Sequence, residues 1–197
     1  MVRWPAAAAA ADYGRERPAL SLGIHLDLGE CAHRNGRWQT VYEVVTTADA
    51  DAVAAEVARQ LAQFRRLVGR DPTHVDSHQH VHLTEPVRGV VFEAAGPLGV
   101  PVRGCTPEVR YRGDFYGQTG KGEPYPQAIT VDAIVGILAA LPPGTTELGC
   151  HPGVGNDFDS VYRRERAAEV AALCDPRVRS AVTGHGVHLR PFPAPRP

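Results

Sequence analysis

The sequence contains few cysteines, and none is spaced like a metal ligand pair. Its four cysteines, Cys31, Cys105, Cys150 and Cys174, are spread over 197 residues, and no Cys-x-x-Cys pair occurs. This pattern excludes a zinc ribbon and a dense disulfide framework. Unpaired thiols in this number are typical of a reducing compartment, so we expect a cytoplasmic protein.

Long apolar runs and an excess of charge of one sign are also lacking. No apolar stretch is long enough to span a bilayer, and the alanines after Pro5 suit the first turns of a helix better than a signal peptide. The 21 basic and 22 acidic residues leave a net charge of −1. Neither nucleic acid nor a membrane is therefore an expected partner, because nothing in the charge balance would attract either.

The length and the hydrophobic share of 43% fit one globular domain, which we place at residues 1–190. The proline-rich segment 191–197 is predicted to be a disordered tail.

Helix and strand signals alternate along the chain. Helices are predicted at 6–17, 49–68, 87–95, 130–141, 162–174 and near residue 178, and strands at 20–28, 74–77, 100–103, 145–150 and 187–189. Between them, 31–47 reads as polar and irregular, and 104–127 as a long functional loop. Alternation of this kind predicts a parallel sheet or barrel with helices outside.

Histidines fall where the predicted strands end, which is where such folds carry their active sites. The strongest signal is His74-Val-Asp-Ser-His-Gln-His-Val-His82. In an extended segment Asp76, His78, His80 and His82 would share one face. A carboxylate among imidazoles suits a metal ligand set, or a ligand with its orienting partner. The alternative is a solvated polar loop.

Other candidate residues stand alone in the sequence. His25 lies in an apolar strand, where a histidine is more often a hydrogen-bonded core residue than a ligand, and Asp27 follows on the same face. His151 precedes Pro-Gly at a strand end, which suits a general acid that protonates a leaving amine, or an exposed turn residue. Phe115 and Tyr116 offer either an aromatic platform for a sugar or packing within their own loop.

Three motifs occur in order along the chain: Gly23-Ile-His-Leu-Asp-Leu, then Pro72-Thr-His-Val-Asp-Ser-His-Gln-His-Val-His, then Glu147-Leu-Gly-Cys-His-Pro-Gly. Together they resemble the YdjC-like carbohydrate deacetylase family, which includes the chitooligosaccharide deacetylases. The resemblance implies a distorted (β/α) TIM-like barrel. It also implies that metal-activated water removes the acetyl group from an N-acetylated amino sugar or oligosaccharide.

The resemblance also implies roles for individual residues. It implies that His25 and His78 bind a divalent metal, Mg²⁺ or Zn²⁺, and that His151 is the active-site acid or a substrate contact. Asp76 and His80 are then expected to support the ligands. The remaining candidates expected to support the ligands or contact the substrate are Asp27, Phe115 and Tyr116.

One motif of the family is missing. Its members begin with a strand that ends in Asn-Ala-Asp-Asp-Phe-Gly, in which one aspartate binds the metal and the pair supplies the catalytic base; this sequence has no such motif. The resemblance therefore implies that a first β–α unit of roughly 30 residues is absent. A start codon further upstream, a fragment, a partner that fills the gap and an inactive relative are the open explanations, and Asp27 or Asp76 could substitute for the acid.

Three functional hypotheses follow. The first is a metal-dependent carbohydrate deacetylase with an N-acetylated sugar as substrate, its activity in this shortened chain left open. The second is a non-catalytic carbohydrate- or metal-binding relative. The third is another metal-dependent hydrolase such as a phosphoesterase, which ranks lower because no Gly-rich phosphate loop accompanies the histidines. The oligomeric state stays open, a homodimer being one option.

Overall fold

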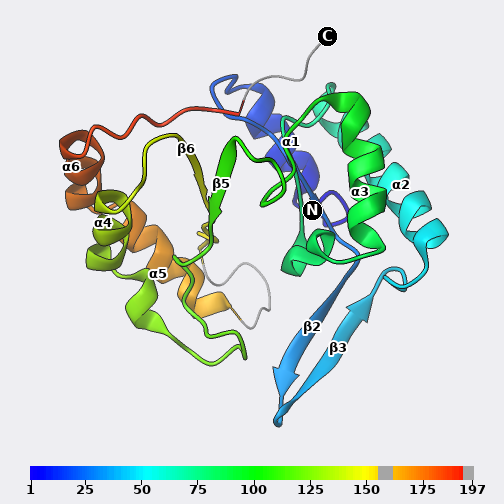
Figure 1. Ribbon diagram of the computed structural model, residues 1–197, viewed down its shortest axis with the longest axis horizontal. Helices are drawn as coiled ribbons and strands as arrows, with labels where there is room; N and C mark the ends of the chain where they lie inside the picture. Colours follow the sequence, from blue (N-terminus) through cyan, green and yellow to red (C-terminus); the bar gives the residue numbers. More distant parts are fainter. Residues whose placement is uncertain (155–161, 193–197) are drawn as a thin grey trace. The chain divides into compact units, whose positions relative to one another are not determined.

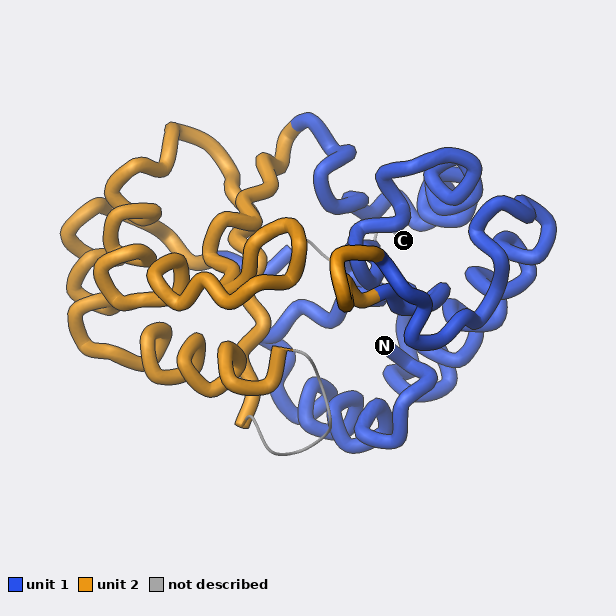
Figure 2. Tube along the Cα trace, turned by 90° about the horizontal axis from the view of Figure 1, so that it is seen from below, with its two compact units in different colours: residues 1–31, 38–107, 190–197 blue, residues 32–37, 108–189 orange. Residues whose placement is uncertain are grey.

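A computed structural model describes residues 1–154 and 162–192. The contacts within the chain divide it into two compact units, drawn in different colours in Figure 2. Unit 1 comprises residues 1–31, 38–107 and 190–197, and unit 2 comprises residues 32–37 and 108–189. The interpretation of residues 1–190 as one domain stays a prediction.

The chain up to residue 107 alternates helices with short strands (Figure 1). The elements are α1 (Ala7–Arg15), β1 (Ile24–Leu26), β2 (Gly29–Arg34), β3 (Arg37–Glu43), α2 (Ala50–Val68), β4 (Val75–Ser77), the 3-10 helix η1 (His78–Leu83), α3 (Val87–Ala95) and the 3-10 helix η2 (Gly96–Leu98). The remaining elements belong to unit 2: β5 (Val109–Arg112), the 3-10 helix η3 (Pro126–Ile129), α4 (Val131–Ala139), β6 (Thr145–Leu148), α5 (Arg163–Leu173) and α6 (Pro176–Gly184).

The strands of the described residues form three two-stranded sheets, of which β1–β4 and β5–β6 are parallel. In the first pair His25 lies opposite Asp76, and a further parallel bridge joins Val75 to Val102. In the second pair Arg110 lies opposite Thr146. These parallel pairs, each joined through intervening helices, confirm the α/β class. Closure into a barrel stays a prediction.

The predicted helix signals are confirmed. Asp49 caps α2, its side chain accepting a hydrogen bond from the backbone of Ala52, and Gly69 ends the helix in the left-handed conformation. Thr130 caps α4 in the same way through Ala133. Across residues 1–154 and 162–192, no helix combines the length and apolar character needed to cross a membrane.

The polar stretch 31–47 is a β-hairpin and not an irregular segment. Asn35 and Gly36 join β2 to β3 with φ values of 54° and 76°. Positive φ at both residues of a two-residue turn matches the right-handed twist of the strands, and Asn-Gly is the dipeptide that adopts it most easily. That dipeptide was the signal in the sequence for the hairpin.

Other predicted strands are shorter than expected. Only Ile24–Leu26 of the segment 20–28 pairs as a strand, residues 100–103 contribute one bridge, and 187–189 forms no strand within the described residues. The predicted loop 104–127 contains β5 and the start of η3. Of the predicted tail, residues 193–197 lie outside the described residues, whereas the ring of Phe192 stacks on His74 with centroids 4.1 Å apart.

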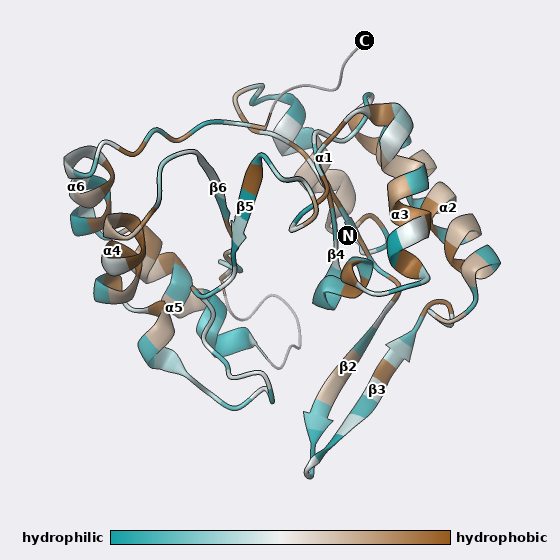
Figure 3. Ribbon diagram, viewed as in Figure 1, coloured by the Kyte–Doolittle hydropathy of each residue, from teal (hydrophilic) through white to brown (hydrophobic). Residues whose placement is uncertain are grey.

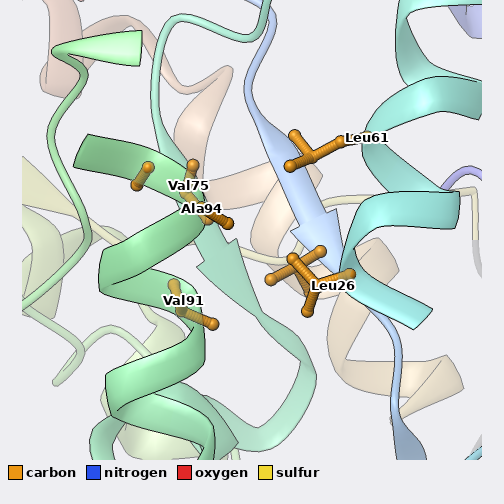
Figure 4. A pocket seen from close by; sticks show the side chains of 7 residues that line it. Leu26, Leu61, Val75, Val91 and Ala94 are labelled. Atoms are coloured by element: carbon orange, nitrogen blue, oxygen red, sulfur yellow. The ribbon is translucent and has the colours of Figure 1, made fainter. Parts of the chain in front are cut away.

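Each unit has its own apolar core. In unit 1, α2 and α3 turn apolar residues towards the β1–β4 pair and keep polar residues on their outer faces (Figure 3). A small cavity remains there, lined by Leu26, Leu61, Val75, Val91 and their neighbours, as Figure 4 shows. In unit 2, Phe115 is fully buried with Ile134 and Leu138 of α4.

We expect Leu26→Ala to lower the free energy of unfolding by about 3 kcal/mol, because it enlarges an existing cavity beside a fully buried side chain. Urea denaturation followed by circular dichroism measures the change. Leu20→Ala is the matched control, since Leu20 is 44% exposed, and its effect should stay within about 0.5 kcal/mol. Equal losses in the two variants would contradict this description of the core.

Candidate metal centre

His25 is oriented by a carboxylate on the neighbouring strand. The β1–β4 register sets it opposite Asp76, and its Nδ1 atom lies 2.9 Å from Oδ1 of Asp76. The other carboxylate oxygen, Oδ2, forms an ion pair with Arg103. Arg103 is held in turn by its backbone N–H, which donates to the carbonyl of Val75 at 3.0 Å. The Asp76 carboxylate of β4 therefore connects His25 of β1 with Arg103, which follows η2 in the chain.

The protonation of this group follows from its surroundings. Burial would raise the pKa of Asp76, but the hydrogen bond from His25 and the positive charges around it lower the pKa to about 2. An ionised carboxylate can only accept, so Nδ1 of His25 donates to it. The lone pair of the imidazole is then on Nε2, on the opposite side of the ring from Asp76. This is the arrangement by which metal-binding histidines are oriented in proteins.

His78 lies beside His25 and presents an unused nitrogen. It follows β4 directly, and its ring meets that of His25 edge-on, with centroids 5.7 Å apart. Its Nε2 atom is buried and makes no hydrogen bond to any described residue. Burial lowers the pKa of His78 to about 4, so the imidazole is neutral at physiological pH. The nearest carboxylate oxygen in an ion-pair arrangement is Oε2 of Glu30, at 3.7 Å.

The segment after His78 is not extended, which corrects the prediction that four polar side chains share one face. Gln79 and His80 adopt left-handed conformations with φ of 52° and 54°, and the chain turns into η1. Non-glycine residues rarely take this conformation, so the surrounding contacts must hold it. One such contact is the Gln79 amide, which donates to the carbonyl of Cys31 at 2.7 Å and accepts from its N–H at 2.9 Å.

His82 is a structural residue and not part of a ligand face. Its side chain is fully buried, and its Nε2 donates to the carbonyl of Arg103 at 3.0 Å. Its Nδ1 then accepts from the hydroxyl of Ser77 at 2.7 Å. These bonds fasten η1 to the end of β4. His80 is half-buried between these groups, with its ring 5.8 Å from that of His82.

Asp27 is engaged on its own side of unit 1. Its carboxylate is fully buried and accepts from Tyr42 at 2.8 Å, Trp4 at 3.1 Å and Arg3 at 3.2 Å. Its backbone N–H donates to Gln60 at 3.0 Å. Because its three donors come from the N-terminal segment and β3, this carboxylate anchors both to β1, whereas His25 is oriented by Asp76.

In unit 2, His151 follows β6 and belongs to an aromatic cluster. Its exposed ring lies edge-on to Tyr116 and Tyr162, with centroids 5.2 and 5.7 Å away, and the two tyrosines stack with centroids 4.5 Å apart. The buried carboxylate of Glu169 accepts from the backbone N–H of His151 and from the Tyr162 hydroxyl at 2.6 Å. Burial raises the pKa of Glu169, although both hydrogen bonds oppose the shift.

Phe115 and Tyr116 are adjacent in the chain but differ in burial. Phe115 has no exposed surface and packs in the core of unit 2, so it cannot form part of a sugar platform. Tyr116 is half-buried and stands beside His151. Cys150, next to His151 in the chain, is excluded as a nucleophile at neutral pH because burial raises its pKa to about 12.

The pair His25 and His78 fits a metal of the zinc type. One imidazole is oriented by a carboxylate, the other has a buried nitrogen that makes no hydrogen bond to a described residue, and the two rings meet edge-on. Neutral imidazole nitrogens are typical zinc ligands, whereas Mg²⁺ prefers oxygen. In the part of the chain that the structure describes, no three His, Cys, Asp or Glu side chains already converge as a ligand set.

Sequence reasoning missed several residues that shape these sites. Arg103 is the last residue of the predicted strand 100–103, and a charged residue at a strand end was the available signal. Glu30 fell between the predicted strand 20–28 and the irregular stretch 31–47, although the Asn35-Gly36 turn indicated that a strand precedes it. Glu169 had no signal, because a glutamate within a predicted helix is usually exposed.

The fold and the two histidine sites define an α/β protein with a candidate metal centre. A model of the family described as YdjC-like protein matches residues 1–183, so the chain belongs to this family. The resemblance carried by the histidine motifs is thereby confirmed.

Named relatives extend the comparison. A carbohydrate deacetylase of Geobacillus stearothermophilus is 29% identical over 210 residues, which cover 96% of this chain and 82% of the relative. A chitooligosaccharide deacetylase of Salmonella paratyphi B is 29% identical, with 90% and 79% covered. A crystal structure from Enterococcus faecalis, named as a candidate cellobiose-phosphate cleavage protein, has a TM-score of 0.72 at 21% identity and covers 98% of this chain and 84% of its own; this likeness concerns the fold.

We expect Tyr162→Phe to lower the free energy of unfolding by about 2 kcal/mol, because it removes a donor to the buried Glu169 carboxylate and an acceptor for the N–H of Gly117. Chemical denaturation measures the change. Tyr125→Phe removes a hydroxyl from a half-exposed ring and serves as the control, for which no loss is expected. Unchanged stability of Tyr162→Phe would show that the buried hydrogen bonds contribute little.

Proposed function

We propose that this chain is a metal-dependent carbohydrate deacetylase that hydrolyses the acetamide of an N-acetylated amino sugar or oligosaccharide. The observation that carries the proposal is the paired geometry of His25, oriented by Asp76, and His78, whose Nε2 is buried without a hydrogen bond to a described residue. The names of the relatives, carbohydrate and chitooligosaccharide deacetylase, support the choice of substrate class.

His25 and His78 would hold the metal through their Nε2 atoms. Such an ion, when bound, supplies Lewis acidity that polarises a carbonyl group and lowers the pKa of bound water. Zinc is the preferred candidate, because two imidazoles suit it and because the His25–Asp76 pair is the usual support for a zinc-binding histidine. The distorted (β/α) barrel is proposed with it, supported by the two parallel strand pairs and the family match.

His151 is proposed as the acid that protonates the departing amine. Its imidazole is exposed, while the buried Glu169 fixes the backbone at this position and the tyrosine pair limits the movement of the ring. Histidine is the side chain that serves most often as a general acid or base, and an exposed ring is open to a substrate. Tyr116 is proposed as the aromatic surface that contacts the sugar. A homodimer stays a prediction.

Acetate release from N-acetylglucosamine oligomers tests the activity. The protein, loaded with Zn²⁺, should release acetate, and dialysis against a chelator should abolish the release. His78→Ala should lower the rate at least about 100-fold, since it removes a direct ligand of the metal. His188→Ala, which changes an exposed histidine, is the control and should keep full activity.

The outcomes separate the candidate functions. Metal binding without acetate release from any oligomer would replace the proposal with a non-catalytic carbohydrate- or metal-binding protein. Hydrolysis of phosphate esters in place of acetamides would replace it with a phosphoesterase.

The support of His25 by Asp76 can be tested through metal affinity alone. We expect Asp76→Asn to weaken Zn²⁺ binding by about 10- to 100-fold, because an amide orients the imidazole less well and lowers its basicity. Titration calorimetry measures the affinity. Asp71→Asn, at an exposed carboxylate paired with Arg65, is the matched control. Equal affinities of both variants would show that Asp76 has no role at the metal.

A further inference from the structure

We propose that Trp4, Tyr42 and Trp38 form an aromatic surface on unit 1 that binds the further sugar residues of an N-acetylated oligosaccharide. This assignment rests on the proposed deacetylase function and names an oligomer, rather than a single sugar, as the substrate. The starting observation is that the chain contains two tryptophans and that both are exposed, Trp4 by 49% and Trp38 by 58%. Tryptophan is on average a highly buried residue, so two exposed ones in the same unit indicate a binding surface.

The three rings form a row along one face of strand β3, which Figure 1 labels. Trp38 and Tyr42 are four residues apart on β3, so their side chains lie on the same face of the strand, about 13 Å apart along it. Trp4 meets Tyr42 edge-on, with ring centroids 5.9 Å apart. The exposed Thr40 lies on the same face between Trp38 and Tyr42 and adds a hydroxyl group. The row therefore has the extended shape that suits an oligomer.

The buried carboxylate of Asp27 holds two of these rings in place. The hydroxyl of Tyr42 donates to its Oδ1 at 2.8 Å, and the indole N–H of Trp4 donates to its Oδ2 at 3.1 Å. The indole N–H is the only polar group of a tryptophan side chain, so the part of Trp4 that is exposed is carbon surface. Sugar rings pack their C–H faces on such surfaces, and rings that are fixed beforehand lose little conformational entropy on binding.

The aromatic row is attached to the segments that carry the candidate metal ligands. Asp27, which holds the rings, follows His25 by two residues. The strand β2 pairs with β3, and the side chain of Gln79 bonds both the backbone N–H and the C=O of Cys31 on β2. Gln79 follows His78 directly in the chain. An oligosaccharide whose reacting sugar is at the two histidines therefore has an aromatic surface in the same unit for its other sugars.

A sugar chain suits this surface better than a second protein does. A stable protein interface needs a broad buried patch with an apolar centre. The neighbouring strand β2 has the sequence Gly-Glu-Cys-Ala-His-Arg and adds no large apolar side chain, and β3 begins and ends with the exposed charged residues Arg37 and Glu43. Aromatic rings flanked by polar side chains match a ligand that has apolar C–H faces and hydroxyl groups at its edges.

Tryptophan fluorescence tests the surface directly, because both tryptophans of the chain belong to it. The tetramer of N-acetylglucosamine, added to the metal-free protein, should change the emission without being hydrolysed. Trp38→Ala should weaken tetramer binding, measured by titration calorimetry, about tenfold or more, as is usual when an anchoring tryptophan is truncated. Trp38→Phe retains a ring and should keep most of the affinity. Tyr13→Ala, at a ring of α1 that is 55% exposed, is the matched control and should bind as the wild type does.

The outcomes separate this surface from the function on which it rests. Equal tetramer affinities of the wild type and Trp38→Ala would overturn the surface alone, even if acetate is released. Tetramer binding that depends on Trp38 without acetate release from the metal-loaded protein would support the surface and overturn the deacetylase. A dimer that dissociates in Trp38→Ala, seen by analytical ultracentrifugation, together with unchanged emission on addition of tetramer, would assign the row to a second copy. If Trp38→Ala folds poorly, Trp38→Thr, a good strand former, carries the same expectation.

Discussion

The site in unit 1 depends on one buried carboxylate. Asp76 accepts from His25 on one oxygen and pairs with Arg103 on the other. It thereby links β1, β4 and the segment after α3, and it determines which nitrogen of His25 carries the proton. Its pKa of about 2 keeps it ionised at physiological pH, so it remains an acceptor for Nδ1 of His25.

Unit 2 also has a buried carboxylate beside a histidine. Glu169 is fully buried on α5 and accepts from the backbone of His151 and the hydroxyl of Tyr162. In both units a buried carboxylate accepts from two donors and thereby fixes the position of a histidine or of its backbone. Such buried polar groups are costly when unpaired, and they specify one arrangement when every bond is made. The two carboxylates differ in effect: Asp76 contacts the imidazole itself, whereas Glu169 acts on the backbone.

Family membership and site geometry support the functional proposal in different ways. The match over residues 1–183 identifies the family, and the relatives' names supply the class of substrate. The geometry adds how each ring is held: Nδ1 of His25 is bonded to Asp76, and Nε2 of His78 is buried without a hydrogen bond to a described residue.

The sequence by itself determined the helices, the α/β class and the family, because apolar periodicity, caps such as Asp49 and Thr130, and the spacing of the histidine motifs are local properties. It also pointed to His25, His78 and His151. Only the tertiary structure decided which neighbours of these residues serve the site. His82 and Phe115 are buried, and Asp27 is bonded to Arg3, Trp4 and Tyr42. Arg103 pairs with Asp76, and Glu30 lies 3.7 Å from His78, both from other segments of the chain. The physical reason is that hydrogen bonds between distant segments, and the left-handed turn at Gln79, redirect side chains in ways that periodicity along one strand cannot show.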